Sequence, residues 1–451
     1  MLQRFRDRLQ LDGTTAYAIG TRLWQAFSGP ITILLIIRSL SLPEQGVYYG
    51  IVTIVGIQAY FELGLLNVLV SHSGHEYAAM RKASGGNSTM EPDATNPGWI
   101  AAAARMRDLT WSSLRWFGFA SLLYVVSALA FGWYALADSE VPWQGPLAVI
   151  IPVAAVSVAL APALSILEGA GCRDLIYRFR FYQMTIGSVV VWVALASGLK
   201  LWALVLASGV QSILAAYITF VEKADFFRSL HQATNQASDF SWRQHVLPMQ
   251  WRVALIGLAF HFATQFFTII VLMFHSDADA APLGMTLTVT TAVQMLALVW
   301  VQTQFPVVAA HHGAGDREKA GTIWRHTAVL STSMLILTLT LLTFAIACLP
   351  MLGMGLEQRF IAPWQVAVLG IGCLANHIAA VQGFYVMSMR ANPLLRASLI
   401  GALTTGAAVW IGGYFFSTTG VIVGYTAAMS LVLVPAHTLA YLKFRKPSSP
   451  S

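Results

Sequence analysis

Residues 326–350 read HTAVLSTSMLILTLTLLTFAIACLP, a stretch of 25 residues without an Asp, Glu, Lys or Arg. About 20 mostly apolar residues are enough for an α-helix to cross the hydrocarbon core of a bilayer. The rest of the chain is similar, since 57% of its 451 residues are hydrophobic and 10% are charged, against about 25% charged in soluble domains. This composition predicts an all-α polytopic membrane protein, and it excludes a soluble enzyme and a nucleic-acid binder.

Twelve apolar runs of membrane length lie along the chain, and a hydrophilic stretch separates six of them from the other six. The runs cover residues 15–38, 46–70, 112–136, 146–169, 181–198, 201–221, 246–274, 281–305, 326–350, 361–388, 395–416 and 419–442. We therefore predict twelve transmembrane helices in two six-helix lobes, at residues 15–221 and 246–442. A linker at 222–245 joins the lobes, an amphipathic segment at 1–14 precedes them, and a tail at 443–451 follows them.

The distribution of basic residues predicts the orientation of these spans. Lys and Arg total 27 and give the chain a net charge of +7. If the N-terminus is cytoplasmic, 23 of them fall in cytoplasmic segments or near the cytoplasmic ends of spans, three fall on the outer side, and Arg22 lies deeper within a span. Cytoplasmic loops of membrane proteins carry such an excess of Lys and Arg. Both termini, with the segment 1–14 and the tail, are therefore expected in the cytoplasm.

The two halves share features that suggest an internal repeat. Gly284 opens span 8 as Gly46 opens span 2, and spans 6 and 12 both end in an aromatic stretch followed by Lys. Six spans per half give both halves the same orientation. The prediction is thus a pair of parallel repeats related by a pseudo-two-fold axis along the membrane normal. Twelve helices with accidental similarity remain the alternative.

Polar residues in spans 1 and 2 form the first candidate site. Thr15, Arg22, Gln25, Gly29 and Thr32 share one helical face, and Gln58 and Glu62 are an i, i+4 pair on span 2. Arg22 and Glu62 lie at one depth, each roughly 24 Å from the outer end of its span. An intramembrane charge is costly and usually functional or paired. Arg22, Gln25, Gln58 and Glu62 are therefore the predicted substrate-binding residues of a hydrated cavity.

Two questions about this site stay open at the level of sequence. Arg22 either pairs with Glu62 or extends to the cytoplasmic interface while Glu62 faces water. The small polar residues of the stripe either line the cavity or pack against a neighbouring helix.

The second lobe holds a second group of polar residues, His261, Gln294 and His377, at similar depths. A histidine titrates near neutral pH and could couple transport to protons. The alternative for each histidine is a hydrogen-bonded core residue. Cys172, Cys348 and Cys373 are too widely spaced to suggest a disulfide framework or a metal site. The sequence predicts no catalytic residue, no metal and no cofactor apart from a coupling ion, H⁺ or Na⁺.

Several segments are similar to a known family over the whole chain. They are LSLPEQGVYY at 40–49, FELGL at 61–65, SGHE at 73–76, PMQWR at 248–252, GMTL at 284–287 and GVIVGY at 420–425. These resemble the bacterial polysaccharide-export branch, with its O-antigen flippases, of the multidrug/oligosaccharidyl-lipid/polysaccharide (MOP) flippase superfamily.

The resemblance implies a V-shaped pair of six-helix lobes that open alternately to the two sides of the bacterial inner membrane. Such a protein would move undecaprenyl-diphosphate-linked oligosaccharide to the outer leaflet for O-antigen and lipopolysaccharide biosynthesis. Arg22 occupies the position of a cavity arginine that would meet the diphosphate. The implied partners are the lipid-linked oligosaccharide, membrane lipid, and a polysaccharide polymerase or export machinery.

The alternative is an ion-coupled multidrug or toxin exporter of the same superfamily. An exporter of organic cations needs an intramembrane carboxylate, which only Glu62 offers in the first two spans. An enzyme acting on the lipid carrier would need sizeable outer loops, and the predicted outer turns are short. A purely structural scaffold would leave the polar stripes unexplained.

Overall fold

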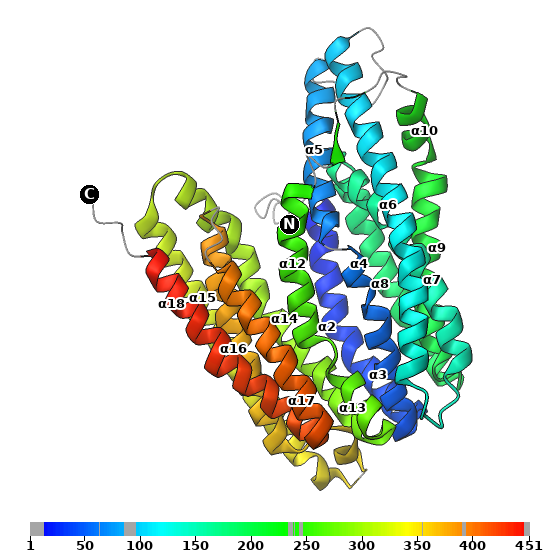
Figure 1. The fold of residues 1–451 in the computed structure, drawn as a ribbon, viewed down its shortest axis with the longest axis vertical. Coiled ribbons are helices and arrows are strands. Elements are labelled where there is room, and N and C mark those ends of the chain that lie inside the picture. Colours follow the sequence, from blue (N-terminus) through cyan, green and yellow to red (C-terminus); the bar gives the residue numbers. More distant parts are fainter. Residues whose placement is uncertain are drawn as a thin grey trace, which may run out of the picture. The chain divides into compact units, whose positions relative to one another are not determined.

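The computed structural model of the chain describes residues 13–62, 64–84, 96–232, 238, 240–242, 247–353, 355–389 and 394–445. Residues 1–12 of the predicted amphipathic segment, 446–451 of the predicted tail, and 233–237, 239 and 243–245 of the predicted linker lie outside these residues. The helices form two compact units (Figure 1). Unit 1 comprises Met1–Ser39, Ile54–Tyr134 and Pro142–Gly257, and unit 2 comprises Leu40–Thr53, Ala135–Val141 and Leu258–Ser451. The two units are defined by the packing contacts of the helices. The predicted lobes, 15–221 and 246–442, are the two halves of a sequence repeat, and they stay a prediction.

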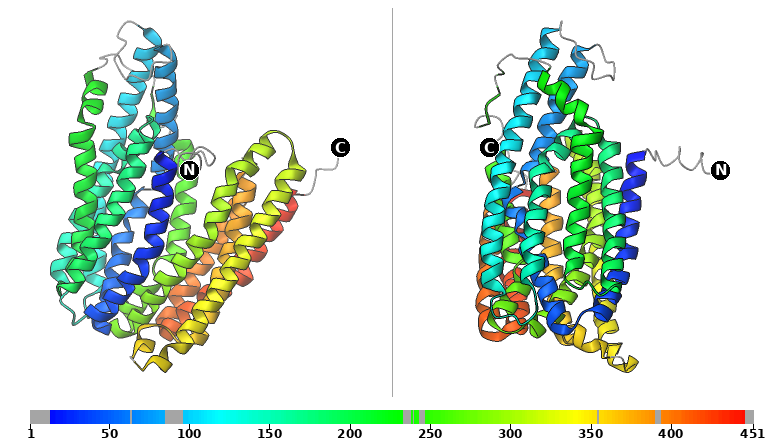
Figure 2. Two further views of the ribbon diagram at one scale, coloured as in Figure 1. Left: turned by 180° about the vertical axis from the view of Figure 1, so that it is seen from behind. Right: turned by 90° about the vertical axis from the view of Figure 1, so that its right-hand side faces the viewer.

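Unit 1 is a bundle of long helices. Its elements are α2 (Gly13–Ser39), α4 (Gln58–Glu62), α5 (Leu65–Ala83), α6 (Pro97–Ala135), α7 (Gln144–Gly169), α8 (Arg173–Ala196), α9 (Trp202–Tyr217), the π-helix η1 (Ile218–Glu222), α10 (Ala224–Gln232) and the first part of α12 (Leu247–Thr264). Helix α2 packs on α8, α8 on α9, and α7 on both α5 and α9 (Figure 2).

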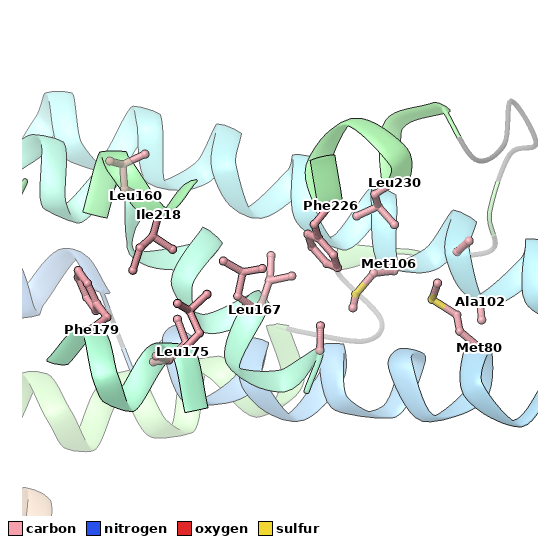
Figure 3. Packing of buried hydrophobic residues seen from close by; sticks show 14 of the residues in the cluster. Met80, Ala102, Met106, Leu160, Leu167, Leu175, Phe179, Ile218, Phe226 and Leu230 are labelled. Carbon is pink, nitrogen blue, oxygen red and sulfur yellow. The ribbon is translucent and has the colours of Figure 1, made fainter. Parts of the chain in front are cut away.

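A hydrophobic cluster joins seven elements of unit 1: α5, α6, α7, α8, α9, η1 and α10. Met80 of α5, Met106 of α6, Leu167 of α7 and Phe179 of α8 pack together with Phe226 of α10 (Figure 3). All five side chains are less than 9% exposed. Full burial of an apolar side chain of this size contributes about 1.5–3 kcal/mol. The cluster therefore fixes the short helix α10 on the ends of the long helices.

Unit 2 is a second helical bundle, which also includes most of the helix at the start of the predicted span 2. Its elements are α3 (Leu42–Gly56), the second part of α12, α13 (Phe267–Phe274), α14 (Asp277–Gly313), α15 (Arg317–Cys348), the 3₁₀-helices η2 (Leu349–Leu352) and η3 (Leu356–Arg359), α16 (Pro363–Met387), α17 (Leu395–Ala428), the π-helix η4 (Met429–Leu433) and α18 (Val434–Arg445). Helix α14 packs on α13, α15 and α16, and α16 packs on α17.

Two glycines let α3 and α14 approach closely within unit 2. A Cβ on Gly46 would overlap the carbonyl of Asp277, and a Cβ on Gly284 would overlap the side chain of Tyr49. Gln45 is fully buried beside them and donates from Nε2 to the carbonyl of Ala281 at 2.9 Å. The two glycines that suggested a repeat thus take part in one helix crossing.

The chain is a multi-pass membrane protein with a nearly all-helical fold. In the described residues, eight helices are long and apolar enough to cross a membrane, and the number rises to ten if each of two bent helix pairs forms one span. One of the eight, Leu395–Lys443, contains a break at Phe416 and Ser417 where two predicted spans join. The total of twelve spans and the cytoplasmic location of the termini stay predictions.

Candidate functional site

Arg22 and Gln25 lie one helical turn apart on α2. Arg22 is exposed, and its Nη1 donates a hydrogen bond to Oε1 of Gln25 at 3.4 Å. A Cβ built on Gly29, one turn further along, would meet no described atom within 4 Å. A guanidinium carries several N–H donors and forms strong charge-assisted bonds to phosphates and carboxylates. This part of the predicted stripe therefore offers a positive group beside open space.

Thr32, by contrast, is a helix-packing residue. The indole Nε1 of Trp192 on α8 donates to Oγ1 of Thr32 at 2.8 Å. Trp24 makes a similar bond from its Nε1 to Oγ of Ser188 at 3.3 Å. The packing alternative thus holds for Thr32, and the side chain of Thr15 lies outside the description. Of the predicted stripe on α2, exposed Arg22 and half-buried Gln25 stay candidates for contact with a solute.

Gln58 and Glu62 lie on the short helix α4, where the second predicted span is broken. Helix α5 begins again at Leu65, after a bend of 43°, and Gly64 at the break has a φ of 64°. Glycine adopts this left-handed conformation without the steric cost that other residues pay. Both Gln58 and Glu62 are half-buried. A break in a spanning helix is tolerated where it is buried in protein or borders water, so Glu62 stands at a position suited to a ligand.

Glu62 differs from the other described carboxylates of unit 1. Each of the others is engaged by another group, and most form ion pairs: Glu76 with Arg105, Asp108 with Arg107, Glu168 with Arg180, Glu222 with Arg178, and Asp225 with Arg228. Glu62 has neither a hydrogen bond nor an ion pair to any described residue, Arg22 included. The structure therefore places both Arg22 and Glu62 in unit 1 but does not pair them. Among the described residues, this half-buried carboxylate has no counter-ion.

His377 of α16 lies deep in unit 2, and its contact with Ser331 indicates which ring nitrogen carries the hydrogen when the ring is neutral. Oγ of Ser331 on α15 donates its single hydrogen to the carbonyl of Ala297 at 2.6 Å. Nε2 of His377 lies 3.0 Å from the same Oγ, so it must carry the hydrogen and donate it. Nδ1 of the neutral ring then bears a lone pair, and this buried atom has no described partner. His377 is therefore a hydrogen-bonded core residue that retains one vacant acceptor.

Gln294 belongs to the same region, one turn before Ala297 on α14. Tyr425 of α17 lies close to both Gln294 and Cys373, and Nε2 of Gln294 is buried without a hydrogen-bond partner among the described residues. Cys373 lies one turn before His377 on α16, so polar groups from α14, α15, α16 and α17 converge here. His261 lies on a different helix, α12, and is half-buried. The sequence alone did not identify Ser331 and Tyr425; a serine in the middle of an apolar span was the available signal.

No cluster of three or more His, Cys, Asp or Glu that could hold a metal ion occurs in the part of the chain that the structure describes. Arg22, Gln25, Gln58 and Glu62 belong to unit 1. Gln294 and His377 belong to unit 2.

The fold has clear counterparts among solved structures. The chain is similar to the Vibrio cholerae MATE transporter VcmN, with 13% identity, coverage of 97% of this chain and 96% of that one, and a TM-score of 0.57. It is also similar to inward-facing and outward-facing structures of a multidrug resistance MATE family transporter of the MOP superfamily. These give TM-scores of 0.56 and 0.54, identities of 12% and 13%, and coverage of 93% and 98% of this chain and 100% and 98% of theirs.

The chain has the fold of a MATE transporter. At identities of 12–13% this likeness concerns the fold. No family model matches the sequence, and no curated protein matches it either. This fold is the one expected from the resemblance of the sequence motifs to the MOP superfamily. The likeness in fold does not distinguish the polysaccharide-export branch from other branches.

Proposed function

We propose that the chain is a transporter of the MOP superfamily that exports organic cations by alternating access, coupled to an ion. It would act in the bacterial inner membrane, without catalysing a reaction. The likeness to both inward-facing and outward-facing multidrug transporters supports the fold needed for such a cycle. The observation that carries the proposal is Glu62, a half-buried carboxylate at a helix break that has no counter-ion within the described part of the chain.

The chemistry of Glu62 supports this assignment. A carboxylate inside a membrane protein is costly as a bare ion, so it needs a partner cation. A proton and an organic cation are alternative partners for the same oxygen atoms. Competition between them would couple release of one to binding of the other. Gln58, one turn away on α4, can add a hydrogen bond to the bound solute.

The exchange of Glu62→Gln tests this role. It keeps the shape of the side chain and removes the charge, so efflux of ethidium from proteoliposomes should fall about tenfold or more. Glu222→Gln is the matched control, because Glu222 is a carboxylate of the same unit that already pairs with Arg178. The control should transport normally. Normal efflux by the Glu62 variant would exclude Glu62 as the binding carboxylate.

Ion coupling would also involve unit 2. We propose His377 and Gln294 as the candidate coupling group there, because Nδ1 of His377 is an acceptor without a described partner. His261, on α12, stays a candidate from the sequence. A proton fits a nitrogen acceptor, whereas Na⁺ prefers oxygen ligands. Transport driven by an imposed pH gradient, but not by a sodium gradient, would support this assignment.

A second candidate function is the flipping of undecaprenyl-diphosphate-linked oligosaccharide, for O-antigen or other surface polysaccharide. Exposed Arg22, bonded to Gln25 beside open space, favours it, because a guanidinium suits a diphosphate. The family resemblance of the sequence motifs favours it as well. A polysaccharide polymerase would then be a partner.

Substitution at Arg22 separates the two functions. Arg22→Ala should abolish translocation of a fluorescent undecaprenyl-diphosphate glycan in proteoliposomes if the chain is a flippase. The same variant should keep ethidium efflux if the chain is a cation exporter. Absence of glycan translocation by the unaltered chain would remove the flippase candidate.

A further inference from the structure

A cavity of about 450 Å³ lies in unit 1. Trp111 of α6, Leu160 of α7, Phe220 of η1, and Phe227 and Arg228 of α10 line it. Its volume is within the range of roughly 300–1,000 Å³ that is typical of ligand pockets. Neither Arg22 nor Glu62 is among its described lining residues. The proposed transport function therefore does not account for this cavity.

The backbone around the cavity is irregular. Helix α9 continues into the π-helix η1, in which Lys223 N donates to the carbonyl of Ile218 at 2.9 Å, five residues earlier. π-helical turns are rare and occur frequently at functional sites. Helix α10 follows directly, held by the buried side chains of Phe226 and Leu230 (Figure 3). The walls of the cavity are therefore positioned by the core of unit 1.

The cavity lies at the level where the predicted spans leave the hydrocarbon. Trp111 immediately precedes the predicted span at 112–136, and Phe220 is one residue from the end of the span at 201–221. Leu160 lies nine residues before the end of the span at 146–169, roughly 14 Å deeper. Trp111 is 41% exposed and Phe220 is 64% exposed. Its apolar walls thus extend from a predicted membrane interface toward the hydrocarbon.

Arg228 is the one positively charged residue among the described residues that line the cavity. Its Nη1 lies 3.1 Å from Oδ1 of Asp225, but Asp225 is almost fully exposed and does not line the cavity. The guanidinium keeps further N–H donors for a second anionic partner. None of the described lining residues is acidic. An apolar space with one cation at its edge is complementary to an amphiphile with a negatively charged head.

We propose that this cavity binds one anionic phospholipid. An acyl chain would lie against Trp111, Leu160 and Phe220, and the phosphodiester would accept hydrogen bonds from Arg228. The basic residues predict that this end of unit 1 faces the cytoplasm, where an anionic leaflet attracts Lys and Arg near the surface. The proposal is independent of the transported solute.

Native mass spectrometry of the purified full-length chain, titrated with phosphatidylglycerol in detergent micelles, tests the charge. Arg228→Gln should weaken binding of one phosphatidylglycerol about fivefold, because one basic group near the surface accounts for about that factor. Arg178→Gln is the matched control, since Arg178 also pairs with a carboxylate and does not line the cavity. It should bind as the unaltered chain does. Equal binding by both variants would overturn the proposal.

A second pair of variants tests the cavity itself. Ala224→Trp would fill it from α10, whereas Val221→Trp adds the same side chain at a nearby position that is 64% exposed and does not line it. Only the first should lose bound phosphatidylglycerol, with both variants retaining the thermal unfolding temperature of the unaltered chain. Should Ala224→Trp unfold, the comparison of Arg228→Gln with Arg178→Gln decides alone. An affinity for zwitterionic phosphatidylethanolamine equal to that for phosphatidylglycerol would contradict the proposal. Detection of a dimer of the chain without bound lipid would contradict it as well.

Discussion

The polar residues of α2 and the polar residues inside unit 2 look alike in the sequence but differ in the structure. Arg22 is exposed and bonds weakly to Gln25 at 3.4 Å, whereas His377 is 2% exposed and bonds to Ser331, which in turn bonds to Ala297. Exposure leaves Arg22 available to a ligand. Because His377 is buried and hydrogen-bonded, we expect it to stabilise unit 2, since removing a buried hydrogen-bonding group costs stability. Substitution of His377 should therefore reduce the free energy of unfolding much more than substitution of Arg22.

The largest loss of stability is expected for His377→Ala. The substitution removes a buried ring and leaves a cavity among α14, α15 and α16, for which core truncations suggest a cost of about 2–4 kcal/mol. Chemical unfolding in detergent micelles, followed by tryptophan fluorescence, measures the difference. An unchanged free energy of unfolding would mean that His377 contributes little to the packing of unit 2.

A smaller loss is expected for Ser331→Ala. Without Oγ, Nε2–H of His377 has no acceptor among its described neighbours, which should cost about 1–3 kcal/mol. Ser127→Ala is the control, because the Ser127 hydroxyl bonds to carbonyls of its own helix. Its effect should stay within about 0.5 kcal/mol. Equal effects of the two serine variants would argue against the network of Ser331 and His377.

The smallest effect on stability is expected for Arg22→Gln, within about 0.5 kcal/mol, because the side chain is exposed. The same unfolding experiment measures it. A loss as large as that of Ser331→Ala would show that this face of α2 is packed, and would contradict its role as an open polar surface.

The helices were largely predictable from the sequence, but their ends outside the membrane were not. The run predicted at 146–169 matches α7, Gln144–Gly169. Helix α6 instead begins at Pro97, well before the run predicted at 112–136, and α5 continues to Ala83 beyond the run ending at 70. The hydropathy of the sequence identifies only the part of a helix that lies in the hydrocarbon core. The helix itself continues as long as its backbone hydrogen bonds and its packing stabilise it. The pair of Arg105 with Glu76 stabilises these extensions.

The candidate site was predictable only where neighbours are close in sequence. Arg22 and Gln25 follow from helical spacing, and so do Gln58 and Glu62. The bond of Thr32 to Trp192 joins residues 160 positions apart, and no periodicity on α2 reveals it. For the same reason the sequence could not decide between pairing and separation of Arg22 and Glu62.

The most direct test of the central claim is whether an organic cation displaces a proton from Glu62. Addition of tetraphenylphosphonium to the purified full-length chain in weakly buffered detergent solution should release protons, followed with a pH-sensitive dye. The account predicts release from the unaltered chain and from Glu222→Gln, and none from Glu62→Gln. Equal release by all three proteins, or binding without any release, would contradict it.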